Sequence, residues 1–177
     1  DKDVELLVVG VGDQYERLRQ YIERKNLADN VKLLGKRKDI VELNAIADVA
    51  IFPTLREGLA VAPLESMLMG LPLISSRARG VVEYSIDKKT GFNFNSYDSE
   101  GMAKAIVRLK QDENLYKFCS DNAICVAHRY GLENAHSIMK QVINNLWNLG
   151  LRRPLNVLDT PFCKAIKGVY IVWKEKR

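Results

Sequence analysis

Short apolar runs of strand type alternate with segments of helical spacing through the first half of the chain. The predicted strands cover residues 6–9, 31–34, 49–52 and 72–75, and the predicted helices cover residues 15–25, 39–47 and 63–69. This alternation is typical of an α/β fold, in which right-handed crossovers build a doubly wound parallel sheet. Ligands bind such sheets at the carboxyl ends of the strands.

Two glutamates separated by seven residues, Glu57 and Glu65, follow the third predicted strand. Pro53 cannot continue a central strand, so the chain turns there. Pro63 suits the first position of a helix that we expect to begin near Ala62. The first N–H groups of that helix, with the positive end of its dipole, are suited to hold a phosphate. Glu65 is expected in the first helical turn, where its carboxylate can accept hydrogen bonds from a ribose diol.

Each glutamate taken alone has a simpler interpretation. Glu65 can merely complement the helix dipole, and Glu57 can be a solvated loop charge. Gly58 lies between them and allows a turn to approach a ligand closely. The strand, the glycine turn and the proline together favour a sugar-nucleotide site over the simpler interpretation.

The segment from Glu57 to Ile74 resembles the signature of family 4 of the retaining glycosyltransferases with the GT-B fold. Further motifs in the same order extend the resemblance from about Val4 to Leu109. They are Val-Gly-Val-Gly at 9–12, Asn-Val-Lys-Leu-Leu-Gly at 30–35, Ala-Asp-Val-Ala-Ile-Phe-Pro at 47–53, Arg-Gly-Val-Val-Glu at 79–83 and Thr-Gly-Phe at 90–92. The stretch at 79–83 is similar to versions in bacterial capsule and exopolysaccharide transferases. The resemblance implies a Rossmann-like domain that binds a nucleotide sugar.

The chain departs from that family's pattern in two ways. Ala60 stands where the family often has glycine, and alanine is less tolerant of unusual backbone angles. The basic pair that these enzymes usually carry on the loop opening the donor domain would lie upstream of Asp1. A length of 177 residues suits one domain, whereas a GT-B enzyme needs two. We therefore expect the C-terminal, donor-binding half, with residues 1–150 as the Rossmann-like domain and an incomplete diphosphate clamp.

The resemblance implies glycosyl transfer from a nucleoside diphosphate sugar, with a UDP-sugar as the expected donor. The anomeric configuration would be retained, and neither a divalent metal nor another cofactor is required. Glu57 is the catalytic-site residue and is assigned to the donor sugar hydroxyls, while Glu65 is assigned to the ribose. Preorganised N–H groups stabilise the charge that develops on the leaving diphosphate. That diphosphate is assigned to the amides of Leu59, Ala60 and Val61, and Gly58 in the same turn is also expected to bind the substrate.

Two other turns are expected at the same edge of the sheet. Gly12 follows the first predicted strand in a turn that lacks the third glycine of the dinucleotide fingerprint, so alone it indicates only a tight strand-to-helix turn. Lys36 and Arg37 follow Gly35. Such charges are more often solvated, but at this edge they can contact the base or phosphates, as the corresponding loop does in the family.

The C-terminal third predicts packing helices near residues 98–110, 114–128 and 133–149, followed by a separate tail. The tail, residues 151–177, is expected to hold a basic amphipathic helix from Thr160 to Trp173, with apolar residues at spacings of three and four. Such a helix can dock on the missing N-terminal acceptor domain, which the resemblance favours, or lie on an anionic membrane surface.

Charge and cysteine content limit the partners. The last thirty residues carry seven basic and two acidic side chains, which account for the whole net charge of +5. The remainder has no basic stripe, so nucleic acid is not an expected partner. Three cysteines without zinc-like spacing favour a reducing, cytoplasmic compartment, with peripheral contact at the inner face of the membrane as a role for the tail.

Two other functions fit the same residues. The first is a catalytically silent nucleotide-sugar-binding or scaffold module, which would bind donor yet never transfer it. The second is a nucleotide-sugar epimerase of similar fold, although such epimerases lack the glutamate pair as a signature.

Overall fold

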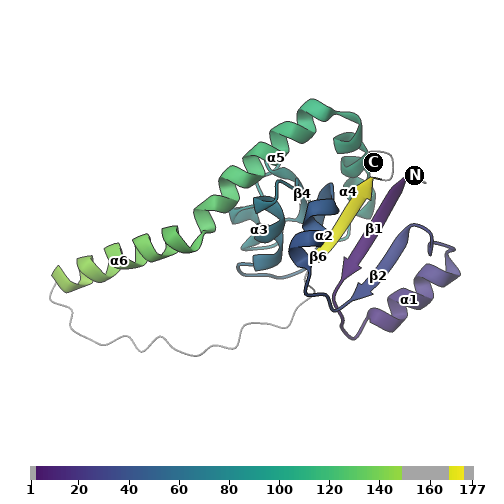
Figure 1. Ribbon diagram of the computed structural model, residues 1–177, viewed down its shortest axis with the longest axis horizontal. Helices are drawn as coiled ribbons and strands as arrows, with labels where there is room; N and C mark the ends of the chain where they lie inside the picture. Colours follow the sequence, from purple (N-terminus) through teal and green to yellow (C-terminus); the bar gives the residue numbers. More distant parts are fainter. Residues whose placement is uncertain (1–2, 149–167, 174–177) are drawn as a thin grey trace.

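The computed structural model describes residues 3–148 and 168–173 (Figure 1). Strands and helices alternate through the first half of the chain, as the apolar periodicity predicts. The elements of that half are β1 (Val4–Val9), α1 (Tyr15–Arg24), β2 (Val31–Gly35), α2 (Ile40–Ile46), β3 (Val49–Phe52), α3 (Val61–Leu68), β4 (Leu73–Ser76), the 3-10 turn η1 (Val81–Glu83) and β5 (Gly91–Phe94).

Three longer helices follow β5. Asp98 caps the first of them by accepting a hydrogen bond from the Gly101 N–H at 2.8 Å, and Asp112 caps the second through the Leu115 N–H at 2.9 Å. The remaining elements are α4 (Ser99–Gln111), α5 (Glu113–Ala127), the 3-10 turn η2 (His128–Tyr130), α6 (Leu132–Asn148) and β6 (Gly168–Trp173).

The described strands form one sheet in the order β2-β1-β6-β3-β4-β5. β1 pairs with β2 in parallel, and β3, β4 and β5 pair in parallel with one another. β6 runs antiparallel between β1 and β3, so β1 and β3 point the same way. The α/β fold is confirmed, and the predicted parallel sheet is present with β6 as an antiparallel strand within it. The turns after β1, β2 and β3 therefore lie at one edge of the sheet, as the sequence predicts.

The helix predicted from Thr160 to Trp173 is wrong for its last six residues, which form β6. Residues 160–167 lie outside the described part of the chain. Valine, tyrosine, isoleucine and tryptophan at 169–173 are strong strand formers, and β1 and β3 offer them a partner on each side. The predicted boundary after residue 150 also fails, because β6 belongs to the same sheet as β1.

Helices cover both faces of this sheet, so successive residues of a strand enter different cores. Ala50 of β3 and Leu73 of β4 pack in a cluster with side chains of α2, α3 and the C-terminal part of α5. Val49 and Ile74, their neighbours along the chain, pack in a second cluster with α4 and Cys119 of α5. Burial on both faces explains the near-continuous apolar runs in the sequence.

Helix α3 begins slightly earlier than the sequence predicts. Its first residue is Val61 and its N-cap is Ala60, so Pro63 is the third helical residue and not the first. Proline remains compatible with the first turn because its missing N–H would have no intrahelical partner. The expectation that Glu65 lies in the first turn is wrong, since the helix starts before Ala62 and places Glu65 in the second turn.

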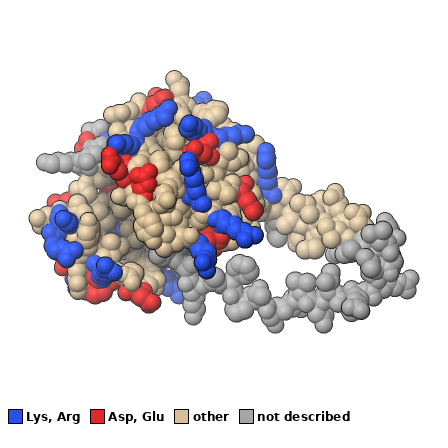
Figure 2. Space-filling view, turned by 180° about the vertical axis from the view of Figure 1, so that it is seen from behind, with Lys and Arg blue, Asp and Glu red and all other residues tan. Residues whose placement is uncertain are grey.

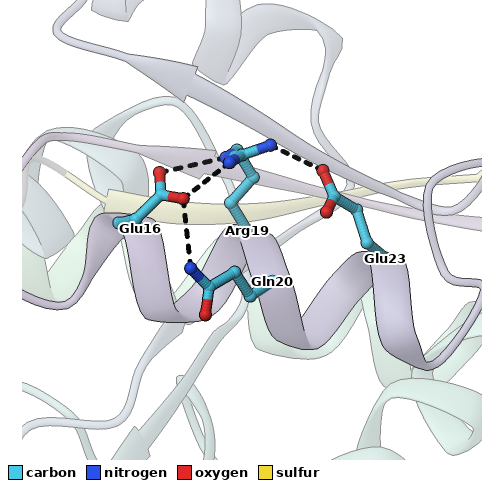
Figure 3. Close-up of polar contacts among 4 residues, drawn as sticks. All are labelled: Glu16, Arg19, Gln20 and Glu23. Atoms are coloured by element: carbon cyan, nitrogen blue, oxygen red, sulfur yellow. Dashed lines mark hydrogen bonds and ion pairs between the residues drawn. The ribbon is translucent and has the colours of Figure 1, made fainter.

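The outer surface carries charges of both signs. On α1, Arg19 bonds Glu16 at 2.6 Å and Glu23 at 2.7 Å, and Gln20 also donates to Glu16 (Figure 3). These exposed pairs at helical spacing contribute little to stability. Figure 2 shows basic and acidic side chains interspersed over one face of the described molecule.

Helix α6 extends away from the body of the molecule (Figure 1). Its side chains Ile138, Met139 and Val142 are exposed. Within residues 3–148 and 168–173, no helix combines the length and apolar character needed to cross a membrane.

Candidate functional site

Hydrogen bonds to Thr54 fix the start of the turn that follows β3. The hydroxyls of Ser76, at the end of β4, and Ser96, just beyond β5, both donate to the Thr54 carbonyl, the latter at 2.9 Å. The Thr54 hydroxyl donates to the Arg56 carbonyl at 3.2 Å. The turn is therefore attached to the carboxyl ends of two neighbouring strands before it reaches Glu57.

Glu57 is half-buried and bends back onto its own turn. Its Oε1 accepts a hydrogen bond from the Gly58 N–H at 3.0 Å. Gly58 is exposed, and apart from Gly58 and its two neighbours in the chain no described residue comes within 4 Å of the position that a Cβ would occupy there. The space next to Gly58 is thus open to a ligand.

The N-terminus of α3 follows directly. Ala60 is its N-cap, with extended backbone angles of φ −86° and ψ 127°, and no side chain caps the first N–H groups. Leu59 and Val61 on either side are exposed. Uncapped N–H groups at the positive end of a helix are suited to bind an anion.

Glu65 lies on the exposed side of α3. The rotation of the helix is set by the next residue, Ser66, whose buried hydroxyl donates to Asn44 Oδ1 of α2 at 2.9 Å. Leu64 and Met67 are buried on the same side. The packing therefore leaves Glu65 exposed to solvent. Glu65 lies on α3, the helix that follows directly after the turn of residues 57–61, which we call the Glu57 turn.

Gly80 packs against this turn from the loop after β4. A Cβ at residue 80 would lie 2.1 Å from the carbonyl oxygen of Gly58 and 2.8 Å from that of Glu57. Gly80 also has a φ of 87°, which side chains other than hydrogen rarely permit. A glycine is required at this position both by its backbone angle and by the contact.

Tyr84 directly follows η1, the 3-10 turn that begins after Gly80, and is completely buried. Burial raises the pKa of its hydroxyl, and the negative charge of Glu57 raises it further. Sequence reasoning missed Gly80 and Tyr84 as parts of the site. The stretch from Arg79 to Glu83 served only to support a family resemblance, and no local spacing indicates a contact with a turn more than twenty residues earlier.

The turns after β1 and β2 meet beside one another. The Gly10 N–H donates to the Gly35 carbonyl at 2.8 Å, and the Gly12 carbonyl accepts from the Tyr15 N–H at the start of α1. Gly12 is exposed, and apart from Gly12 and its two neighbours in the chain no described residue comes within 4 Å of the position of a Cβ there. A cavity of about 260 Å³ lies here, lined by Val9, Gly12, Gln14, Tyr15, Leu18 and Leu33 among others.

Lys36 and Arg37 lie just beyond β2 and differ in their surroundings. Lys36 is exposed. Arg37 forms a two-pronged ion pair with Asp39, with its Nε 2.8 Å from Oδ1. Hydrogen bonding to Arg37 is the main cause that lowers the pKa of Asp39 to about 2. Arg37 must share or leave this pair to contact a ligand.

The two groups of turns are separated by one strand. β6 lies between β1 and β3, and neighbouring strands are about 4.8 Å apart, so the carboxyl ends of β1 and β3 are about 10 Å apart. One extended ligand can reach both ends. The structure thus brings Gly12, Gly35 and the Glu57 turn to a common edge.

Metal-binding side chains do not cluster in the part of the chain that the structure describes: no group of three or more His, Cys, Asp or Glu residues is placed to hold an ion. Cys119 is a buried free thiol and Cys125 an exposed one. Cys163 lies outside the described residues.

Known proteins match this chain over most of its length. It is 30% identical over 121 residues to N-acetyl-alpha-D-glucosaminyl L-malate synthase of Bacillus anthracis, covering 68% of this chain and 32% of that protein. It is 31% identical over 144 residues to UDP-Gal:alpha-D-GlcNAc-diphosphoundecaprenol alpha-1,3-galactosyltransferase of Escherichia coli, covering 79% and 35%. The chain therefore spans about a third of the length of these curated relatives.

Solved structures share the fold. The structure of Anabaena HepE in complex with UDP-glucose superposes with a TM-score of 0.69 at 28% identity, covering 80% of this chain and 40% of that one. The family model described as glycosyl transferases group 1 matches residues 1–125, which include β1 to β5 and every turn described above. The chain belongs to the group 1 glycosyltransferase family.

Proposed function

We propose that this chain is the C-terminal, donor-binding half of a retaining GT-B glycosyltransferase and that it binds a nucleoside diphosphate sugar, with UDP as the nucleotide. The observation that carries the proposal is the turn from Glu57 to Val61. It combines open space at Gly58, uncapped N–H groups at the start of α3 and two exposed or half-buried carboxylates. The complex of the structural relative with UDP-glucose supports the choice of nucleotide.

The diphosphate binds to the amides of the turn and of the first helical residues. Leu59, Ala60 and Val61 supply N–H groups, whereas Pro63 has none to give. Negative charge grows on the diphosphate as the bond to the anomeric carbon breaks, and N–H groups already in place stabilise that charge without reorganisation.

The two carboxylates bind different parts of the donor. Glu57, within the turn, accepts hydrogen bonds from the sugar hydroxyls, and Glu65, on α3, accepts them from the ribose. Neither acts as a nucleophile. The rate comes from positioning and from charge stabilisation at the diphosphate.

The base and the phosphates reach the other turns at the same edge. Gly12 permits close approach beside the cavity at the end of β1, and Lys36 and Arg37 contribute positive charge at the end of β2. No divalent metal or other cofactor takes part in this proposal.

The acceptor binds on a second domain that supplies the rest of the diphosphate clamp. Both curated relatives above are about three times as long as the matched region, which is consistent with a two-domain enzyme. We place the reaction in bacterial polysaccharide or glycolipid synthesis, of the capsule or exopolysaccharide type, in the cytoplasm at the inner face of the membrane. Relatives named for amylovoran and colanic acid biosynthesis support that assignment.

The proposal is tested by calorimetry of this chain with UDP-, GDP- and ADP-sugars. We expect the UDP-sugars to bind in preference to the GDP- and ADP-sugars, more weakly than to a two-domain enzyme, with negligible transfer by the chain alone. Robust turnover by the 177-residue chain would contradict the assignment of the acceptor site to a second domain. Binding that never leads to transfer, even with an added acceptor-domain half, would instead identify a silent module.

A further inference from the structure

The hydroxyl group of Tyr84 is a buried polar group without a hydrogen-bond partner among the described residues. Buried polar groups normally have partners, so an orphan donor requires an explanation. Tyr84 directly follows η1, which begins after the contact of Gly80 with the Glu57 and Gly58 carbonyls, and the charge of Glu57 acts on the pKa of its hydroxyl. The hydroxyl proton has no acceptor among the described residues.

The packing around Tyr84 holds this hydroxyl in place. The ring belongs to the core formed with α3 and α5, and it meets Tyr130 edge-on at 6.0 Å between ring centroids. Gly80, four residues earlier, contacts the Glu57 and Gly58 carbonyls so closely that the loop and the turn must move together. The ring, and with it the hydroxyl oxygen, cannot be displaced without repacking this core.

In this structure the Glu57 carboxylate accepts a hydrogen bond from an N–H group of its own turn. Its Oε1 accepts from the Gly58 N–H, which lies among the amides that an anion would use. A diphosphate at the turn competes for that N–H and repels the carboxylate. A displaced carboxylate needs another donor, because it can only accept hydrogen bonds.

We propose that Tyr84 is a positioning residue for Glu57: when a nucleoside diphosphate sugar occupies the turn, the Tyr84 O–H donates to the displaced Glu57 carboxylate. One carboxylate oxygen then faces Tyr84 and the other is left to accept from a donor sugar hydroxyl. Tyr84 itself does not touch the donor. This inference rests on the proposed function and adds the group that orients the carboxylate towards the sugar.

The test compares Tyr84→Phe with the wild-type chain by calorimetry. The probes are UDP-glucose, UDP-galactose, UDP-N-acetylglucosamine, GDP-glucose and ADP-glucose, and the sugar nucleotide that binds the wild type best is paired with its own nucleoside diphosphate. We expect Tyr84→Phe to weaken binding of the sugar nucleotide by roughly tenfold or more and binding of the free diphosphate by a clearly smaller factor, because both ligands displace the carboxylate but only the sugar then donates a hydrogen bond to it. The melting temperature should not fall, because the substitution removes only an unpartnered hydroxyl.

Tyr130→Phe is the matched control. Tyr130 contacts the ring of Tyr84, and its hydroxyl donates to the Glu83 carbonyl at 3.1 Å. Removal of the Tyr130 hydroxyl should lower the free energy of unfolding. It should leave the ratio of the affinities for sugar nucleotide and free diphosphate unchanged. In a Glu57→Gln background, Tyr84→Phe should have a much smaller effect on that preference, because the charged acceptor is gone.

Three results would overturn the inference. Equal affinities of Tyr84→Phe and wild type for the sugar nucleotide would show that the hydroxyl is a tolerated orphan of the core. Equal losses of affinity for the sugar nucleotide and for the free diphosphate would show that Tyr84 acts on the turn as a whole. A wild-type chain that binds none of the probes would contradict the proposed function itself, and the role of Tyr84 would fall with it.

Discussion

Gly80 and Gly58 are in such close contact that a single methyl group at residue 80 would overlap the Gly58 carbonyl oxygen, 2.1 Å away. The loop after β4 therefore sets the shape of the turn after β3. The two glycines have opposite surroundings, since residue 58 faces open space and residue 80 faces backbone.

This difference predicts opposite effects of the same substitution. Gly80→Ala should destabilise the fold by about 1–3 kcal/mol or distort the turn, because the backbone angle and the contact both exclude a Cβ. Gly58→Ala should change the unfolding free energy by less than about 1 kcal/mol and weaken nucleotide binding. Denaturant unfolding and calorimetry on both variants make the comparison. A stable Gly80→Ala variant with unchanged ligand affinity would refute it.

Glu65→Ala is expected to weaken the binding of both the free nucleotide and the sugar nucleotide. A hydrogen bond to a charged group contributes about 1.5–3 kcal/mol, so the loss should be roughly 10- to 150-fold in affinity. Calorimetry with UDP measures it, and circular dichroism checks that the fold is intact. Unchanged UDP affinity in a folded variant would remove Glu65 from the site.

Arg37→Ala should raise the pKa of Asp39 from about 2 towards the ordinary aspartate value, because the main cause of the lowered pKa is the hydrogen bond from Arg37. Carboxyl carbon NMR during an acid titration measures this pKa. Since the pKa is lowered by folding, any stabilisation from the pair is present at neutral pH and is lost as the pH falls towards about 2. An Asp39 pKa that Arg37→Ala leaves near 2 would assign the shift to the backbone instead.

Ile171→Pro tests the position of β6. Residue 171 pairs with Leu6 of β1 and with Val49 of β3, and proline cannot donate to a neighbouring strand. We expect the free energy of unfolding to fall by about 2 kcal/mol or more, equivalent to a fall in Tm of roughly 4–8 °C for a chain of this size. Ile171→Val, which keeps a branched side chain, is the control. A proline variant with the same Tm as the wild type would place residues 168–173 outside the sheet.

The sequence was sufficient for the elements whose signals are local. Residues 49–52 form a strand with the predicted bounds, because apolar residues buried on both faces make a continuous run. The turn and helix from Glu57 to Leu68 were also predictable, from one glycine and two prolines. The start of α3 was misplaced by one residue, since Val61 already satisfies helical geometry ahead of Pro63.

The larger failures involve contacts between residues far apart in the chain. The spacing of apolar residues from 162 to 173 fits a helix, and only the partners at β1 and β3, more than a hundred residues earlier, turn its end into a strand. Gly80 and Tyr84 enter the site in the same way, through packing against a turn that no local pattern connects to them.

The separate roles of the two glutamates are tested most directly by Glu57→Gln. Glutamine keeps the size of the side chain and one acceptor but loses the charge, so it changes the carboxylate alone. Paired calorimetry with UDP and with the matching UDP-sugar is the measurement, on this chain and on the same substitution in a two-domain form. We expect UDP affinity to stay within about threefold of the wild type, while the additional affinity conferred by the sugar and the rate of transfer both fall. A large loss of UDP affinity with normal turnover at saturation would contradict it and make Glu57 a ligand of the nucleotide.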